Sequence, residues 1–495
     1  MGKATRVKRT YDPPALPEKV LCDLRDIVGR EHVLTALEDR LSYGYDASKL
    51  SAIPQAVVFP ANAQHVAQVV RLANQWRLPV YPRGAGSGMV GGVVPDRGGL
   101  VLSLARLNRI LQIHTEDMVA VVEPAVVTGV FQKTVAQHGL FYPPDPASLE
   151  FSTIGGNVAT CAGGPRAVKY GVTRDYVLGL EAVLPTGELI TTGTRTMKGV
   201  VGYDLTRLLV GSEGTLGVIT KIVVRLIPAP EAVMTISAVF SSIEQAGQAV
   251  CAVLQARVVP TCLELLDAAT LRAVQSYCPL GVPEQAEGML IAEVDGPPEV
   301  LPRHIGIMEE VFRRHGAVEI LRAETPQDRE KLWTARRSIS PALGRIRSGK
   351  INEDVTVPRS RIADLIKFNQ ALTRKHDLVI VSFGHAGDGN IHTNIMVDRS
   401  DPQELARAEK AVEELFREVL RLEGTISGEH GIGITKSSFF QWEVHPGAFD
   451  AMLRIKRALD PHDIMNPGKM FLPNRAFFQT TGVSGRRTTP NGRTF

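Results

Sequence analysis

The sequence predicts an α+β fold built from more than one domain. The chain has 495 residues, which is too long for a single hydrophobic core and indicates two or three domains. Segments with helical periodicity alternate with short apolar strand-like runs, and glycine is dense between residues 155 and 217. Hydrophobic residues make up 44% and charged residues 22%, so the chain can bury a large core.

Composition excludes several classes of partner. The net charge of +4 comes without a clustered basic motif, so we expect no nucleic-acid partner. Apolar runs are too short for a membrane span, and the N-terminus lacks the apolar stretch of a secretory signal. The five cysteines are scattered without metal-ligand spacing, which is typical of a reducing cytoplasm.

The N-terminal half of the chain reads as short strands and two amphipathic helices. Residues 1–16 look like a loose arm, and 17–50 look helical. Between residues 155 and 217 we expect sheet and loops around a ligand, because glycine lets backbone approach one closely. The other expected strands are 56–59, 80–82, 100–104 and 118–123, and the expected helices are 62–76 and 129–138.

Residues 228–230, Pro-Ala-Pro, mark the expected domain boundary. The predicted division is an arm with helices over 1–50, domains over 51–228 and 229–472, and a mobile polar tail over 473–495. The clearest helix of the second domain is 402–422. Asp401 is its expected N-cap, Glu404 completes a box-like start, and Gly424 is its expected end.

The glycine loop from Arg83 to Gly92 contains a dinucleotide-binding pattern. Gly86, Gly88 and Gly91 satisfy G-x-G-x-x-G, which requires a helix directly after it. The following Val-Val-Pro run argues against that helix, so a Rossmann fold is excluded. A nest of backbone N–H groups around phosphates, or a surface loop without ligand, remains.

Further glycine clusters favour a ligand. They lie at 153–157, 162–164 and 211–217, and the segment Tyr142–Pro146 lies before them. Four segments with special backbone within one domain indicate an extended ligand.

These segments resemble a known family. The 141–146, 154–157 and 211–217 runs are similar to the PCMH-type FAD-binding domain of the vanillyl-alcohol oxidase superfamily, over roughly residues 20–472. The chain resembles its D-2-hydroxy-acid dehydrogenase branch, with the glycolate oxidase catalytic subunit, D-lactate dehydrogenase and D-2-hydroxyglutarate dehydrogenase. The resemblance implies a two-lobed FAD-binding domain, an α+β substrate (cap) domain with an antiparallel sheet, and a C-terminal segment that returns to the FAD domain.

The resemblance also implies where FAD binds. No histidine lies between Arg83 and Gly99, so we expect FAD to be held without a covalent bond. The implied cofactor-binding residues are Arg83, Gly84, Ala85, Gly86, Ser87, Gly88, Pro144, Asp145, Ser148, Gly155, Gly156, Asn157, Gly163, Gly164, Glu213, Gly214, Gly217, Ile219 and Asn466.

A second constellation lies in the C-terminal half. His385 and His392 flank a Gly-Asp-Gly-Asn turn signal, which predicts a hairpin that brings both imidazoles together. Glu429 and His430 follow in a glycine-flanked run. Two histidines and a carboxylate make an open set of ligands for a catalytic divalent metal, and zinc, manganese and iron each fit it.

The resemblance assigns roles to these residues. It implies that His385, His392 and Glu429 bind the metal and that His430 is the catalytic base. Arg336 would hold the substrate carboxylate, with Arg337 as its rival. The further substrate-binding positions are Ser340, Asn394 and Asn352.

One departure from the family bears on the substrate. Relatives acting on dicarboxylates carry a lysine where this chain has Asn352, which disfavours a second substrate carboxylate. The expected reaction is therefore FAD-dependent oxidation of D-lactate or glycolate. Lys350 lies close by and keeps D-2-hydroxyglutarate open.

Two other classes of function remain as alternatives. They are a metal-dependent hydrolase without flavin and a non-catalytic flavoprotein subunit of a glycolate oxidase complex. Relatives pass electrons to an iron–sulfur subunit, and the scattered cysteines would place such a cluster in a partner chain. Quinone, cytochrome or another flavoprotein are open as acceptors. We expect a cytoplasmic protein, with peripheral association at the inner membrane and a homodimer both open.

Overall fold

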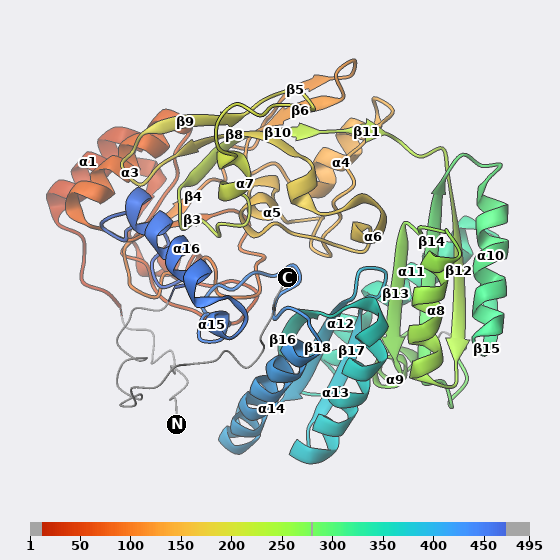
Figure 1. Cartoon of the computed structure of the whole chain (residues 1–495). Helices are drawn as coiled ribbons and strands as arrows, with labels where there is room; N and C mark the ends of the chain where they lie inside the picture. Colours follow the sequence, from red (N-terminus) through yellow and green to blue (C-terminus); the bar gives the residue numbers. More distant parts are fainter. Residues whose placement is uncertain (1–11, 279–280, 472–495) are drawn as a thin grey trace.

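A computed structural model describes residues 12–278 and 281–471. Its N-terminal part contains a four-stranded sheet in the order β1-β2-β4-β3, in which β2, β4 and β3 run parallel and β1 is antiparallel to β2 (Figure 1). Buried side chains of α1 and α3 form one core with this sheet. The elements are α1 (Glu18–Val28), η1 (Arg30–His32), β1 (Val33–Leu34), α2 (Leu37–Ser42), β2 (Ala56–Val58), α3 (Ala63–Trp76), β3 (Val80–Arg83) and β4 (Leu100–Ser103).

A second, antiparallel sheet has the order β5-β6-β10-β8-β9, and the short pair β11-β7 lies beside it. Helices α4 and α5 contribute to the core of this sheet. The elements are β5 (Ile110–His114), β6 (Val119–Val122), α4 (Thr128–Ala136), β7 (Leu140–Phe141), α5 (Ile154–Thr160), α6 (Ala167–Tyr170), η2 (Thr173–Asp175), β8 (Val177–Val183), β9 (Leu189–Gly193), α7 (Leu205–Leu209), β10 (Val218–Arg225) and β11 (Ile227–Pro228).

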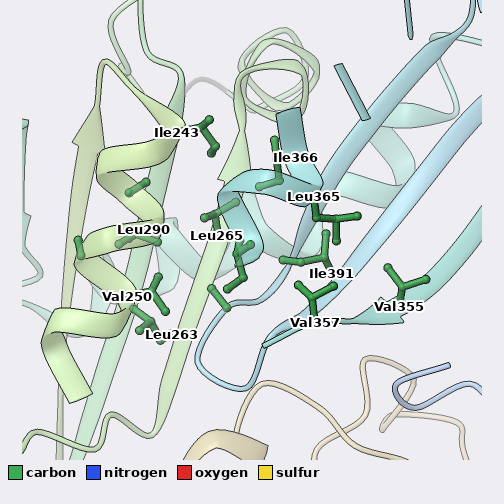
Figure 2. Packing of buried hydrophobic residues seen from close by; sticks show 14 of the residues in the cluster. Ile243, Val250, Leu263, Leu265, Leu290, Val355, Val357, Leu365, Ile366 and Ile391 are labelled. Carbon is green, nitrogen blue, oxygen red and sulfur yellow. The ribbon is translucent and has the colours of Figure 1, made fainter. Parts of the chain in front are cut away.

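The third sheet has seven antiparallel strands in the order β15-β12-β14-β13-β17-β18-β16. Helices α8, α10, α13 and α14 contribute to the main core on one face, and Figure 2 shows Val250 of α8 and Leu365 of α13 turned toward its strands. Helices α9, α11 and α12 cover part of the other face. The strands are β12 (Ala232–Phe240), β13 (Cys262–Asp267), β14 (Gly288–Gly296), β15 (Ala317–Arg322), β16 (Gly349–Thr356), β17 (Val379–His385) and β18 (Asn390–Val397).

The helices of this part follow the same order along the chain. They are α8 (Ile243–Gln255), α9 (Ala268–Gln275), α10 (Leu301–Arg314), α11 (Pro326–Arg337), α12 (Ile339–Leu343), η3 (Arg359–Arg361), α13 (Ile362–His376) and α14 (Pro402–Arg421).

The C-terminal segment returns to the first sheet. After α15 (Phe440–Glu443) and α16 (Pro446–Leu459), Met465 pairs with Val80 of β3 in parallel. Figure 1 shows α16 beside the N-terminal sheets. Lys469 is fully buried there, where its Nζ donates to the carbonyl of Val94 and pairs with Asp96. The predicted α+β class, with an antiparallel sheet in the second part and a returning C-terminus, is confirmed.

Several expected elements are confirmed at their predicted places. Helix α3 follows Asn62, whose side chain accepts the N–H of His65. Helix α14 follows Asp401, whose carboxylate accepts the N–H of Gln403. The strands and helices predicted from 56 to 138 are present within a few residues.

Three expectations are wrong. Helix α14 is not ended by Gly424, because the left-handed residue after it is Glu423, with φ of 63°. Glu404 forms no capping box, since its carboxylate accepts the N–H of Asp398. The stretch 155–217, expected as sheet and loops, includes α5 and α7, because Thr153 and Asp204 cap helices there with their side chains.

The arm expected over 1–16 is partly wrong. Leu16 is buried in the core, and Asp12 pairs with Arg40 at 2.8 Å, so residues 12–16 are anchored at both ends although Asp12, Pro14 and Ala15 are exposed. Residues 1–11 and the expected mobile tail at 473–495 lie outside the described residues. Within the described ranges, no helix has both the length and the apolar character needed to cross a bilayer.

Candidate active site

One face of the seven-stranded sheet carries a row of polar side chains. Because side chains alternate along a strand, cross-strand partners share a face. His392 of β18 lies opposite Phe383 of β17 and Asp354 of β16, and His385 lies opposite Glu264 of β13. Asn394 lies opposite Asn352 two residues further on, on the same face. The predicted hairpin is confirmed, with His385 ending one strand and His392 near the start of the next.

The loop that carries Glu429 and His430 is held over this face by Asp354. One carboxylate oxygen of Asp354 accepts the backbone N–H groups of Glu429 and His430, both at 2.8 Å. The other accepts the side-chain amide of Asn390 at 2.6 Å. The pKa of Asp354 is lowered, because the neighbouring His430 and Lys436 outweigh its burial.

The hairpin and the loop together create a compact triangle of ligand atoms. The Nε2 atoms of His385 and His392 are 3.5 Å apart, and Oε1 of Glu429 is 3.6 Å and 3.5 Å from them. Three atoms about 3.5 Å apart leave about 2.0 Å from their centre to each, the bond length of a divalent metal with nitrogen and oxygen ligands. The three residues predicted as ligands therefore fit such an ion.

Protonation states in the triangle also suit a cation. Burial lowers the pKa of His392 to about 3, which keeps its imidazole neutral. Burial opposes ionisation of Glu429, but His385 holds the pKa of this carboxyl below its usual value. Burial alone would lower the pKa of His385, yet the carboxylates of Glu264 and Glu429 raise it well above its usual value.

Glu264 orients His385 from behind. Its carboxylate lies 2.6 Å from Nδ1 of His385 and accepts Nε of Arg336, also at 2.6 Å. Glu264 is fully buried, and the charges of His385 and Arg336 overcome that burial and hold its pKa at about 2. A carboxylate on Nδ1 leaves Nε2 free for a metal, an arrangement common around metal-binding histidines.

A different group of four residues also has ligand atoms within 4.8 Å of one another: Asp354, His392, Glu429 and His430. The two oxygens of Asp354 are already taken by two backbone N–H groups and by Asn390. We therefore favour the triangle, whose distances are shorter. The ring of His430 stacks on that of His392, with centroids 5.5 Å apart, and stays next to the triangle.

A cavity of about 220 Å³ joins the loop of Glu429 and His430 to the glycine loop. All three parts of the chain thus meet at one site. The predicted cofactor residues that line it are Arg83, Gly84, Ala85, Gly86, Ser87, Gly88, Ser148, Gly155, Gly156, Asn157, Glu213, Gly214, Gly217 and Ile219.

Five predicted cofactor residues lie outside the lining of this cavity. Pro144 accepts Gln132 through its carbonyl, and Asp145 pairs with Arg166 at 3.3 Å. Gly164 lies against Asp145, and a Cβ on Gly163 would be 2.9 Å from Glu429. The side-chain amide of Asn466 donates to the carbonyls of Gly92 and Glu213.

The walls of the cavity suit a long phosphate-containing cofactor. Gly86, which lines the cavity, has a positive φ angle of 71°, a backbone conformation that other residues rarely adopt. A Cβ on Gly84 would meet the hydroxyl of Thr153, so the loop lies directly on the start of α5. The residues present therefore fit FAD.

The predicted substrate residues are distributed unevenly. Arg336 and Asn394 lie beside the histidines, the latter fully buried. Asn352 is half-buried with its amide 3.8 Å from Met89 of the glycine loop. Ser340 is exposed and accepts Lys350 at 2.8 Å. The rival Arg337 pairs with Glu330 at the surface.

Three residues near the site were missed by sequence reasoning. Glu264 lies in the largely apolar run Cys-Leu-Glu-Leu-Leu of β13, and that pattern was the available signal. Asp354 lies in the mostly polar strand β16 and gave no such signal. Lys436 is buried and donates to the carbonyls of Asp354 and Ile426. Its sequence neighbours give no sign of this position.

Comparisons with known proteins agree with this geometry. Residues 54–193 match the family described as FAD binding domain, and residues 229–470 match FAD linked oxidases, C-terminal domain. The chain is 42% identical over 449 residues to glycolate oxidase subunit GlcD of Bacillus subtilis (strain 168), covering 90% of this chain and 96% of that protein. The chain belongs to the FAD-linked oxidases. The predicted family is confirmed.

This FAD-linked oxidase is also similar to a second relative in sequence and to a solved structure in fold. It is 35% identical to D-lactate dehydrogenase of Anaerostipes hadrus, covering 85% of this chain and 90% of that one. Its fold is similar to that of p-cresol methylhydroxylase with substrate bound, with a TM-score of 0.75 at 19% identity, covering 92% and 96% of the two chains. At that identity the likeness concerns the fold alone.

Proposed function

We propose that this protein oxidises a small D-2-hydroxy acid, D-lactate or glycolate, to the 2-oxo acid with FAD as the oxidant. The observation that carries the proposal is the shared cavity, in which His430 and Glu429 face the glycine loop. The names of the two relatives, glycolate oxidase subunit and D-lactate dehydrogenase, support it.

Different residues are proposed to bind the cofactor, bind the metal and hold these groups in place. FAD, held without a covalent bond by the glycine loop, would accept the hydride from the substrate carbon. A divalent ion, whether zinc, manganese or iron, would be held by His385, His392 and Glu429, and would lower the pKa of the substrate hydroxyl. Glu264 and Asp354 keep these groups in place from behind.

His430 is proposed as the base that takes the hydroxyl proton. Its Nε2 lies 3.9 Å from Glu429, so a hydroxyl next to the metal triangle is within reach. Its Nδ1 lies 4.0 Å from the ionised Asp354, which stabilises the imidazolium after proton transfer. Histidine suits this step because its ordinary pKa is near neutrality.

Arg336 is proposed to hold the substrate carboxylate. Its Nε is bonded to Glu264, and among the described residues no hydrogen bond from its two terminal nitrogens to a protein acceptor is found. A half-occupied guanidinium can still donate two parallel bonds to a carboxylate. Asn394 and Asn352, whose amide oxygens are buried without a partner, are proposed to contact the substrate.

The electron acceptor is proposed to lie in another chain. The five cysteines are free and scattered, so they do not form an iron–sulfur site here. The word subunit in the name of the Bacillus subtilis relative supports a complex, and an iron–sulfur subunit is the proposed partner. The proposed location is the cytoplasm, including the inner face of the membrane.

Anaerobic bleaching of the flavin tests the proposal. We expect D-lactate or glycolate to bleach the visible absorbance of the flavin, L-lactate and D-2-hydroxyglutarate to act poorly, and a chelator to slow the reaction. A His430→Asn variant should bleach about 10² to 10⁴ times more slowly. A colourless protein would favour the hydrolase, and a flavin that no 2-hydroxy acid reduces would favour the non-catalytic subunit.

A further inference from the structure

Glu213 stands out among the residues that line the cavity. Its side chain reaches across to the loop of the other domain, where its two oxygens accept the backbone N–H groups of Ile432 and Gly433, each at 2.7 Å. The residue is 8% exposed. Its carboxylate is therefore occupied by protein backbone.

The loop closes tightly around this carboxylate. Gly431 has a φ angle of 89°, and a Cβ there would be 2.8 Å from Oε1 of Glu213. One residue earlier comes His430, whose N–H is held by Asp354 from the sheet side. Residues 429–433 are thus held by two buried carboxylates, one from each domain.

The backbone of Glu213 is itself fixed in an uncommon conformation. Its φ angle is 52°, a left-handed value that is strained for a non-glycine residue. Its N–H donates to Ala159 of α5 at 2.8 Å, and its carbonyl accepts the amide of Asn466 at 2.6 Å. Surrounding structure holds this strained residue at one position, as is common where geometry matters for function.

We infer that Glu213 is a positioning residue that sets the place of Glu429 and His430 relative to the flavin. The inference rests on the proposed function, because it takes His430 as the base. It assigns the Glu213 carboxylate to the catalytic loop in place of the cofactor. Gly214, Gly217 and Ile219 line the cavity just after it, so one segment touches both the cofactor cavity and the loop.

Substitution of Glu213 by glutamine is the test. Glutamine keeps the size but has one acceptor oxygen, so one of the two N–H groups of the loop loses its partner. We expect kcat to fall about 10- to 100-fold, as for a displacement of a catalytic group by part of an ångström, while KM changes less than about threefold. A 2-deuterated substrate should show a larger isotope effect on kcat than in the wild type.

The matched control is Glu123→Gln. Glu123 is also a buried glutamate of the FAD-binding part whose carboxylate accepts a backbone N–H, that of Arg109 at 2.8 Å. It lies away from the loop, so kcat should stay at the wild-type value even if the melting temperature falls. An equal loss of kcat in both variants would overturn the inference.

Hydrogen exchange of the FAD-loaded proteins gives a readout without turnover. The amides of Ile432 and Gly433 should exchange faster in Glu213→Gln and at the wild-type rate in Glu123→Gln. Unchanged exchange together with unchanged kcat in Glu213→Gln would overturn the inference. If wild-type flavin is not reduced by any 2-hydroxy acid, the proposed function fails, while the exchange rates still decide whether Glu213 holds the loop.

Discussion

At the scale of single residues, buried carboxylates behind the candidate site hold its side chains in place. Glu264 joins His385 to Arg336, so it fixes a proposed metal ligand and a proposed substrate ligand at once. Neutralising it in Glu264→Gln should lower the affinity for Mn²⁺ or Zn²⁺ about 10- to 100-fold, the usual effect of losing such an outer partner. Calorimetric titration of the metal-free protein measures it.

Glu293 offers a control for this prediction. It is a buried glutamate of the same sheet, and it binds Arg329 and Trp333 with no histidine at its carboxylate. Glu293→Gln should reduce thermal stability and leave metal affinity unchanged. Equal metal affinities in the two variants would contradict the role given to Glu264.

The adjacent arginines allow a second test at this scale. Arg336→Lys keeps the charge but loses the planar fork, so KM for the hydroxy acid should rise roughly tenfold or more. Arg337→Lys alters a surface residue and should leave KM unchanged. Steady-state kinetics with an artificial electron acceptor measure KM for both variants. If KM rises in Arg337→Lys and not in Arg336→Lys, the carboxylate-binding role belongs to Arg337 and not to Arg336.

The sequence indicated the residues with the strongest chemical signatures. His385, His392, Glu429 and His430 stood in glycine-rich runs, and the structure brings them together, although their roles remain predictions. Glu264 and Asp354 could not be found in this way. Their contacts join strands β13 and β16 to residues far along the chain, and strand pairing is not visible in local periodicity.

At the scale of elements, the β17–β18 hairpin has one vulnerable position. Gly389 has a φ angle of 91°, and a Cβ on it would overlap the carbonyl oxygen of Val357. Gly389→Ala should therefore destabilise the fold by more than about 2 kcal/mol, because overlap adds to the cost of a left-handed alanine. Thermal denaturation measures the loss.

A substitution at Gly202 measures the cost of the left-handed conformation without the steric overlap. The φ angle of Gly202 is 80°, and a Cβ there has no atom within 4 Å among the described residues. Gly202→Ala should then cost only the about 1 to 2 kcal/mol of the left-handed conformation. A Gly389→Ala variant no less stable than Gly202→Ala would show that the turn can relax.

Helices were predictable from sequence where their apolar stripe was long. Helix α14 has a stripe over five turns and was placed within one residue at each end. The seven-residue helix α5 was not predicted, because its Ile-Gly-Gly-Asn start has the composition of a loop. There the cap formed by Thr153 and contacts with the rest of the domain decide the conformation over local propensity.

At the scale of the whole molecule, the two proposed ligands are held by different parts of the chain. The triangle comes entirely from residues after 380, whereas the glycine loop lies before residue 100. Removing the metal with a chelator should therefore abolish most turnover and leave FAD bound. Gel filtration followed by an absorbance spectrum checks this, and co-release of flavin with metal would contradict it.

The overall class of the fold was predictable, because length, glycine clusters and the Pro-Ala-Pro segment all pointed to separate parts. The order of strands was beyond reach. Each of the neighbouring pairs β13–β17 and β6–β10 joins segments about a hundred residues apart, and such pairings depend on packing that develops only in the complete chain.

The pairing of Met465 with Val80 has a consequence for how the protein is made. Synthesis runs from the N-terminus, and domains generally fold as they emerge. Here the first sheet lacks this neighbour until residue 465 has left the ribosome. Asn466, which contacts Gly92 and Glu213, arrives equally late. These contacts with the glycine loop and Glu213 therefore form only once residues 465 and 466 have been made, and a gene cut at the Pro-Ala-Pro segment would encode an incomplete flavin domain.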